Sequence, residues 1–431
     1  MNGNPVNASP PNVGAAKLRI EDLRDPVLTD AQRAALAHAE RHPADLTVDA
    51  VLARARTITG LDDFGSDDFV ERLRVWLDEI RLDPNRTALA GRIMFDLCVK
   101  YAANRLRITG LLARHPKIHD QEIVAPLFIT GLPRTGTTHL VNLLAADTRF
   151  RSLPLWEADQ PVPDRGEGPG VDGVDPRYVR CDRAWQRMRA GNPYLAAWHP
   201  MNPDSIHEDI ELWANDFAGY NIEWIFQMAP RWREHYLAHD QTSHYRYLKT
   251  VLKVLQWYRP GERWLLKCPQ HLENLGPLME VFPDATVVMT HRDPVGAVQS
   301  AATMRAYGSR TAYRRFDVAE ILEYWTDLME RLLRAGVDDR HLVPEGRILD
   351  VYFDRFMADT MGTVEQVYRH AGMELTERAR AEIIAYVDAH PRDKHGSMTY
   401  DLRADFGITP ERLRDRFAFY LRQHPVPVEV R

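Results

Sequence analysis

Cysteine is scarce in this sequence: only three occur in 431 residues, at Cys98, Cys181 and Cys268. They lie far apart and show no metal-ligand spacing, so we expect neither a disulfide framework nor a cysteine-bound metal site. The sequence also lacks an uninterrupted apolar run long enough to cross a membrane. It does not open with a basic segment followed by an apolar one, as a secretory signal does. These absences predict a cytoplasmic protein with no membrane span.

An excess of positive charge is missing as well. Lysine and arginine number 55 against 61 acidic residues, which gives a formal net charge of -6 at pH 7. This balance argues against a general nucleic-acid-binding surface, so any anion site must be formed locally by particular residues. Hydrophobic residues make up 45% of the chain and charged residues 27%, which is typical of a globular protein with a large core.

Three regions follow one another along the chain. Residues 1–24 begin with a stretch rich in proline and asparagine and are predicted to form a disordered tail. In residues 25–120, apolar residues recur at helical spacing from Phe69 to Ile80 and from Leu89 to Tyr101, which predicts a helical segment packed on the core. Residues 121–431 are predicted to form one α/β domain.

Short apolar runs alternate with helical patterns in this third region. The runs span residues 126–130, 264–266, 286–290 and 347–351. Strands that alternate with helices form parallel sheets whose faces the helices cover. The predicted fold class is therefore α/β: a P-loop-type parallel sheet covered by helices, with an N-terminal helical extension.

A glycine-containing loop follows the first of these runs, with the sequence Gly131-Leu132-Pro133-Arg134-Thr135-Gly136-Thr137-Thr138. Its glycines let backbone N–H groups approach an oxyanion, and the helix that follows adds partial positive charge and threonine hydroxyls. A nucleotide triphosphatase needs lysine directly after the second glycine, where this loop has Thr137. The basic residue is instead Arg134, inside the loop. A P-loop kinase or triphosphatase is therefore kept only as an alternative.

The run 286–290 leads into a second candidate anion site. It is followed by His291-Arg292-Asp293-Pro294 and a helical stretch that reaches Ser300, eight positions after Arg292. These residues, together with Arg134, resemble sulfotransferases that use PAPS (3′-phosphoadenosine 5′-phosphosulfate), and segments 60–64, 153–157, 264–269 and 282–284 look like the bacterial members of that family. The Arg-Lys-Gly element of the cytosolic animal enzymes has only a loose counterpart at 392–396, so Lys394 is left out of the predicted site.

The resemblance implies how the nucleotide is bound. The 3′-phosphate would be held by Arg292 and Ser300, and PAP would be the nucleotide product. The residues implied around the 5′-phosphosulfate are Arg134, Thr135, Gly136, Thr137 and Thr138.

The implied reaction is an in-line transfer of the sulfuryl group to an acceptor hydroxyl, which requires cations and a general base. Arg134 and Lys267 are the implied cations, and no metal is expected. Two residues compete as the base: His271, whose ordinary pKa suits proton abstraction, and Glu157, placed where carbohydrate sulfotransferases carry a catalytic glutamate. We prefer His271. The segment His207-Glu208-Asp209 lies ahead of an apolar helix and could reach the acceptor, but acidic residues at a helix start more often complement the helix dipole, so the segment is left out of the predicted site.

An aromatic-rich insertion at about 177–257 separates the glycine loop from Lys267. Because this fold places acceptor contacts there, the resemblance implies a small hydrophobic or aromatic alcohol or phenol as acceptor. Packing of a helical core explains most of these aromatic residues equally well, and a non-catalytic nucleotide-binding protein on the same scaffold is a further alternative. The aromatic residues concerned are Trp198, Trp213, Phe217, Tyr220, Trp224, Phe226, Trp232 and Tyr236.

Overall fold

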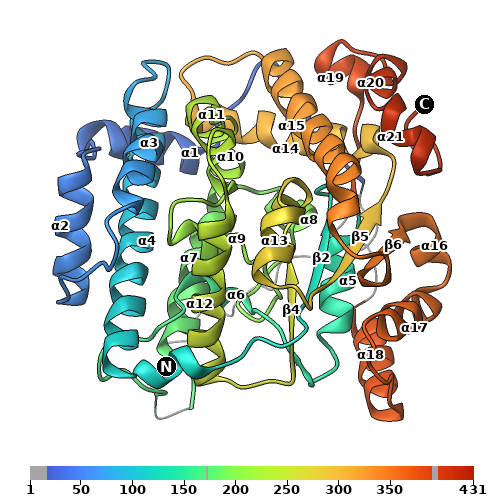
Figure 1. Cartoon of the computed structure of the whole chain (residues 1–431). Helices are drawn as coiled ribbons and strands as arrows, with labels where there is room; N and C mark the ends of the chain where they lie inside the picture. The colour runs from blue at the N-terminus through green and yellow to red at the C-terminus, as the bar shows by residue number, and fades with distance from the viewer. Residues whose placement is uncertain (1–16, 171–172, 391–396) are drawn as a thin grey trace, which may run out of the picture.

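A parallel sheet of five strands, in the order β3-β4-β2-β5-β6, lies at the centre of the computed structural model, which describes residues 17–170, 173–390 and 397–431 (Figure 1). The four predicted strands are confirmed as β2, β4, β5 and β6. The short β3 was not predicted, because a strand of two residues carries no periodic signal. The strands are β2 (Leu127–Gly131), β3 (Phe150–Arg151), β4 (Arg263–Lys267), β5 (Thr286–His291) and β6 (Ile348–Tyr352).

Helices form most of the remaining described chain. They are α1 (Asp30–Arg41), α2 (Val48–Thr59), α3 (Phe69–Arg81), α4 (Ala88–Arg114), α5 (Thr137–Leu144), α6 (Leu155–Asp159), α7 (Pro176–Gly191), α8 (Leu195–Trp198), α9 (Ile210–Ala214), α10 (Asn221–Phe226), α11 (Pro230–Leu237), α12 (Thr242–Tyr258), α13 (Leu275–Val281), α14 (Pro294–Ala312), α15 (Val318–Asp338), α16 (Phe353–Ala358), α17 (Thr360–His370), α18 (Glu377–Ala389), α19 (Leu402–Phe406), α20 (Pro410–Arg416) and α21 (Ala418–Gln423). Short 3₁₀ turns span Pro116–Asp120, Pro269–Glu273, Asp339–Leu342 and Glu345–Arg347. No described helix is both long and apolar enough to cross a membrane.

Each face of the sheet has its own hydrophobic core, because successive strand residues point to opposite faces. Phe128 and Val287 face a core built with α12, α13, α14 and α15. Ile129 and Val288 face a second core built with α5, α17 and α18. Both faces are therefore covered, which is why these strands are apolar throughout, and the predicted α/β class is confirmed.

The helices before the sheet form a further layer. Figure 1 shows α2, α3 and α4 side by side, and their buried residues share one core with residues of α9, α10 and α11. Both helical stretches predicted here are confirmed: α3 begins at Phe69, and α4 contains Leu89 to Tyr101. The aromatic-rich insertion therefore packs largely against the N-terminal helices.

The disordered tail predicted for residues 1–24 ends too late in the sequence. Residues 1–16 of that prediction lie outside the described residues, but residues 17–24 belong to the fold. Lys17–Leu18 is strand β1, which pairs in parallel with β7 (Ser397–Met398), and Ile20 and Leu23 are each only 2% exposed. The sequence did not indicate the pairing of β1, because its partner strand β7 lies near the other end of the chain.

The sheet register brings three strand ends together. Gly131 at the end of β2 is paired with Thr290 of β5, and Ile129 is paired with Lys267, the last residue of β4. The chain leaves β2 toward β3 on one side and returns through β4 to β5 on the other. Ligands of open α/β sheets bind where the connections diverge in this way, at the carboxyl ends of the strands.

Candidate active site

The glycine loop is a tight turn between β2 and α5 that only glycine can complete. Gly131 and Gly136 have φ values of 146° and 90°. A Cβ atom on Gly131 would lie 2.2 Å from Thr290 Oγ1, and one on Gly136 would lie 2.7 Å from the ring of Phe353. The Thr135 hydroxyl donates to the carbonyl of Leu132 (2.6 Å) and lies 2.7 Å from Thr290 Oγ1. The contact between Thr135 and Thr290 therefore holds the loop against β5, and α5 begins directly after the loop.

Arg134 lies inside this loop with a φ of 73°, a left-handed conformation that is uncommon for a residue other than glycine. Its Nε donates to Ser300 Oγ (3.2 Å), and its Nη1 donates to the carbonyl of Trp198 (2.9 Å). Among the described residues it pairs with no carboxylate, and burial lowers the pKa of its guanidinium. Arg134 therefore brings positive charge to the loop without an opposing charge of its own.

The two predicted anion sites meet at Arg134. Arg292 follows β5 directly, and its Nη1 donates to the carbonyl of Arg134 (2.8 Å). Ser300, on α14, accepts from Arg134 Nε and lies 2.9 Å from the hydroxyl of Tyr400. Arg134 is 158 positions from Arg292 and 166 from Ser300 in the sequence but contacts both, so the loop and the start of α14 lie side by side. Lys394 lies outside the described residues.

Lys267 connects the loop to a carboxylate that sequence reasoning set aside. Its Nζ donates to Thr138 Oγ1 (3.3 Å) and forms an ion pair with Glu208. Thr138 is exposed at the mouth of the loop, whereas Thr137 is buried. Glu208 does precede α9, which begins at Ile210, and its carboxylate also binds Lys267.

A model of the "Sulfotransferase family" matches residues 126–377, a range that contains the loop, Lys267, Arg292 and Ser300. This chain belongs to the sulfotransferase family. Members of that family are enzymes that transfer sulfuryl groups, and the suspected family is thereby confirmed.

Two solved structures and a curated protein from mycobacteria are similar to this sulfotransferase. The crystal structure of STF9 from Mycobacterium avium superposes with a TM-score of 0.79, at 28% identity, over 90% of this chain and 99% of that chain. STF1 from Mycobacterium tuberculosis H37Rv gives a TM-score of 0.75, at 29% identity, over 86% of this chain and 98% of that one. A curated relative in Mycobacterium bovis, "Omega-hydroxy-beta-dihydromenaquinone-9 sulfotransferase Stf3", is 25% identical over 335 residues, which are 71% of this chain and 78% of the relative.

The two residues predicted to compete as base both face the interior of the sulfotransferase. His271 is 0% exposed; its Nδ1 lies 2.8 Å from the Tyr245 hydroxyl, and its Nε2 lies 3.1 Å from Asp209 Oδ2. Glu157 is 3% exposed, and both of its carboxylate oxygens are engaged by Arg151 and Arg259 at 2.7 to 3.0 Å. Both assignments stay predictions. The side chain of Glu208, by contrast, is 19% exposed at the strand ends.

Further polar groups surround Glu208 and Lys267 without having been predicted. Burial lowers the pKa of His199 well below its ordinary value, and the charges of Lys267 and His207 lower it further. The imidazole of His199 is therefore neutral near pH 7. Burial lowers the pKa of Arg305 to about 9. The Arg305 Nε and the hydroxyl of Tyr220 are buried without a hydrogen-bond partner among the described residues. His271 Nε2 and both carboxylate oxygens of Asp209 are likewise buried without a hydrogen-bond partner in the described structure, and a ligand or water can complete the bonding of such atoms.

Most aromatic residues of the insertion are core residues of the helical layer. Trp224 is only partly buried. The Arg305 guanidinium lies over its ring, 4.8 Å from the ring centre, and the centre of the Tyr220 ring is 6.4 Å away. Trp198 packs against Tyr307 while its carbonyl binds Arg134. The buried remainder of the set is Trp213, Phe217, Phe226, Trp232 and Tyr236.

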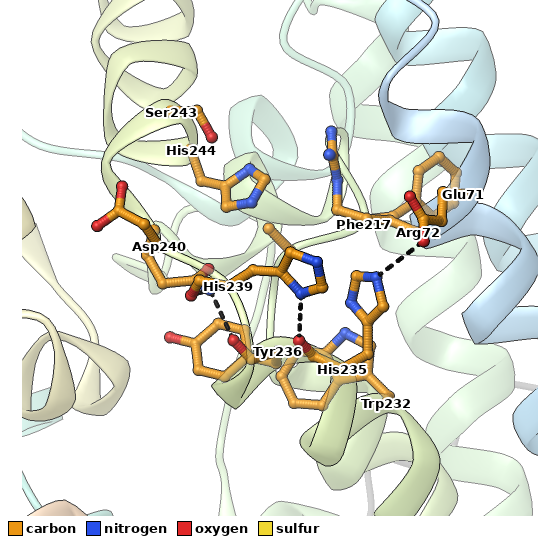
Figure 2. Close-up of a pocket in the computed structure, with 12 residues that line it drawn as sticks. Glu71, Arg72, Phe217, Trp232, His235, Tyr236, His239, Asp240, Ser243 and His244 are labelled. Carbon is orange, nitrogen blue, oxygen red and sulfur yellow. Dashed lines mark hydrogen bonds and ion pairs between the residues drawn. The ribbon is translucent and has the colours of Figure 1, made fainter.

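A separate cavity of about 120 Å³ lies between α3, α11 and the start of α12 (Figure 2). Trp232 and Tyr236 line it, and the rings of His235 and His239 stack there with centres 4.3 Å apart. None of the described residues that line this cavity belongs to the glycine loop or to the strand ends. This cavity is therefore separate from the region of Arg134 and Lys267, where the glycine loop meets the strand ends.

Proposed function

We propose that this sulfotransferase moves the sulfuryl group of PAPS to a hydroxyl of a small, hydrophobic acceptor and releases PAP. The observation that carries the proposal is the junction of Arg134, Arg292 and Ser300 beside the glycine loop. The backbone N–H groups of the loop and of the first turn of α5 suit the 5′-phosphosulfate. Arg292 and Ser300 suit a second anion beside it, and a 3′-phosphate is what distinguishes PAPS from ATP.

The chemistry needs charge stabilisation at the leaving oxygen and a base at the attacking one. In the proposed reaction the acceptor oxygen bonds to sulfur, while the bond from sulfur to the bridging 5′-phosphate oxygen breaks. Arg134 and Lys267 stabilise the charge that develops on that bridging oxygen. The base takes the proton of the acceptor hydroxyl. Of the three candidates, Glu208 is the one that lies beside Lys267 with a partly exposed carboxylate, so we assign it this role ahead of His271 and Glu157.

Burial, followed by the charge of Glu208, raises the pKa of Tyr220, and Trp224 lies beside Tyr220; both residues suit a hydrophobic acceptor that carries a hydroxyl. Trp224 offers apolar surface, and the unpartnered Tyr220 hydroxyl can hold the hydroxyl of the acceptor. The name of the relative Stf3 specifies an omega-hydroxy-dihydromenaquinone, a hydroxyl on a hydrophobic molecule, which supports the same acceptor class here.

PAP is expected to bind more tightly than ADP by about 2 to 4 kcal/mol, because Arg292 and Ser300 make charge-assisted hydrogen bonds to the 3′-phosphate. Arg292→Ala should remove this preference and leave ADP affinity nearly unchanged. Calorimetry with both nucleotides checks it, with ATP and magnesium as a further arm. A mutant that still prefers PAP by the wild-type margin, or a wild-type protein that prefers magnesium ATP, would contradict the proposal.

Turnover is expected to survive EDTA, since Arg134 and Lys267 supply the positive charge that magnesium supplies in kinases. The measurement is the initial rate of sulfuryl transfer before and after chelation, with added magnesium as the control. Activity that is lost on chelation and restored by magnesium would favour the kinase alternative.

A further inference from the structure

The Arg292 guanidinium is already bound to a carboxylate of the chain itself. Its Nε donates to both oxygens of Glu429 (2.8 and 3.0 Å), and its Nη2 donates to Glu429 Oε2 (2.7 Å). The third nitrogen binds the carbonyl of Arg134. The edge of Arg292 that would bind a phosphate through two nitrogens therefore holds Glu429 instead.

The segment that carries Glu429 is anchored on the residues that follow β5. Asp293 Oδ2 accepts from the backbone N–H of Glu429 (2.8 Å) and of Val430 (3.3 Å). Figure 1 shows α20, α21 and the end of the chain gathered beside α15 at this end of the sheet. Residues 424–431, which we call the strap, thus run along the strand end where the 3′-phosphate site lies.

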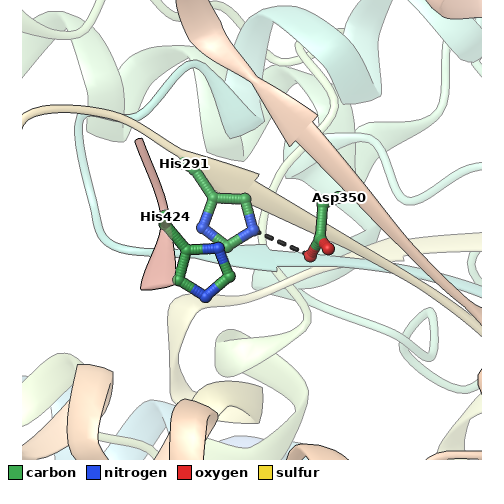
Figure 3. Close-up of side chains that lie close together, drawn as sticks. All are labelled: His291, Asp350 and His424. Carbon is green, nitrogen blue, oxygen red and sulfur yellow. Dashed lines mark hydrogen bonds and ion pairs between the residues drawn. The ribbon is translucent and has the colours of Figure 1, made fainter. Parts of the chain in front are cut away.

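His424 fixes the start of the strap. Its ring stacks on that of His291, with centres 4.0 Å apart and planes at 15° (Figure 3). The His291 Nε2 lies 2.9 Å from Asp350 Oδ1, and Arg340 donates to both oxygens of Asp350 at 2.8 Å. His291, Asp350 and His424 are close enough to hold a metal ion, but Arg340 already neutralises the carboxylate, so we interpret the group as an anchor.

Ser300, the other predicted contact of the 3′-phosphate, also has partners within the chain. Its hydroxyl lies 2.9 Å from that of Tyr400 and accepts from Arg134. The Arg292 and Glu429 side chains are 29% and 33% exposed, so solvent reaches the pair. Exposed ion pairs contribute little to stability, whereas a phosphate brings more charge and more acceptor oxygens to the same guanidinium.

We propose that Glu429 sets the affinity for the donor by occupying the 3′-phosphate site, so that the nucleotide binds only when this carboxylate leaves Arg292. The inference rests on the proposed function, since it takes Arg292 as the 3′-phosphate ligand. Glu429 then competes with every nucleotide that carries a 3′-phosphate and leaves nucleotides without one unaffected. It also returns to Arg292 as PAP departs, which favours product release.

Glu429→Gln tests the proposal, because glutamine keeps the shape of the side chain and removes its charge. PAP should bind about 3- to 10-fold more tightly to this variant, and ADP affinity should not change. Glu429→Asp, whose shorter carboxylate reaches Arg292 less well, should fall between the two. Glu411→Gln is the matched control, since it removes the same charge from α20 at a residue that pairs with Arg403 and not with Arg292.

The outcomes separate this inference from the proposed function. If the wild type prefers PAP and Arg292→Ala loses that preference, but Glu429→Gln binds PAP as the wild type does, the competition is refuted and the donor site stands. Equal tightening by Glu411→Gln, or tightening of ADP as well, would also refute it by revealing a general charge effect. A wild type without any preference for PAP would overturn both.

Discussion

Replacing Glu208 with glutamine is expected to slow sulfuryl transfer by about 10² to 10⁴ while PAP affinity changes little, because a base acts on the acceptor proton in the transition state. Glutamine keeps the size of the side chain but cannot take up the proton. Steady-state rates with a hydroxylated acceptor, together with calorimetry of PAP, check both halves of this expectation.

His271→Ala and Glu157→Gln belong in the same assay, because the sequence favoured these two residues. Both side chains are buried and bonded, so their loss should act mainly on stability, and thermal unfolding of each variant measures that part. A large rate defect in folded His271→Ala, with Glu208→Gln close to the wild type, would return the role of base to His271. A pH–rate profile of whichever variant is impaired then identifies the group that titrates.

Lys267→Met is expected to lower kcat by about 10² to 10³, because it removes a cation placed to stabilise charge on the leaving oxygen. Methionine keeps most of the buried side-chain volume. The variant also leaves Glu208 without its ion-pair partner, so kcat and KM must both be measured.

Lys249→Met provides the matched control for Lys267→Met. Lys249 is a partly buried lysine of α12 whose Nζ donates only to the carbonyl of Val281 in the described structure. It should lose no activity. A Lys267→Met variant whose KM rises while kcat stays unchanged would show that Lys267 binds substrate without acting on the transition state.

The donor side of the proposed site was predicted from short motifs and from the family resemblance that they carry. The glycine loop has its own spacing, and Arg292 and Ser300 lie eight positions apart around a helix start, so each element carries its signal within about ten residues. The apolar strands are equally local, since burial on both faces makes them continuous runs. Their assembly follows from the parallel sheet, whose carboxyl ends share one edge.

Contacts between distant segments could not be predicted in this way. Glu208 and Lys267 are 59 positions apart, and Glu429 is 137 positions from Arg292. An acidic residue ahead of a helix looks the same whether it complements the helix dipole or binds a lysine elsewhere. The same limit explains why residues 17–24 looked like a tail: their partners are β7 and Asp405, which Arg19 binds at 2.8 Å.

The pairing of β1 with β7 has a consequence for folding during synthesis. All five strands of the central sheet have been made once the ribosome has passed Tyr352, so the sheet and the glycine loop can assemble first. Lys17–Leu18 must wait for Ser397, and Ser300 must wait for Tyr400. Closing such long loops is entropically slow. Until Tyr400 has been synthesised, a nascent chain with an assembled sheet would lack the contact of Ser300 with Tyr400, and Glu429 would not yet lie beside Arg292.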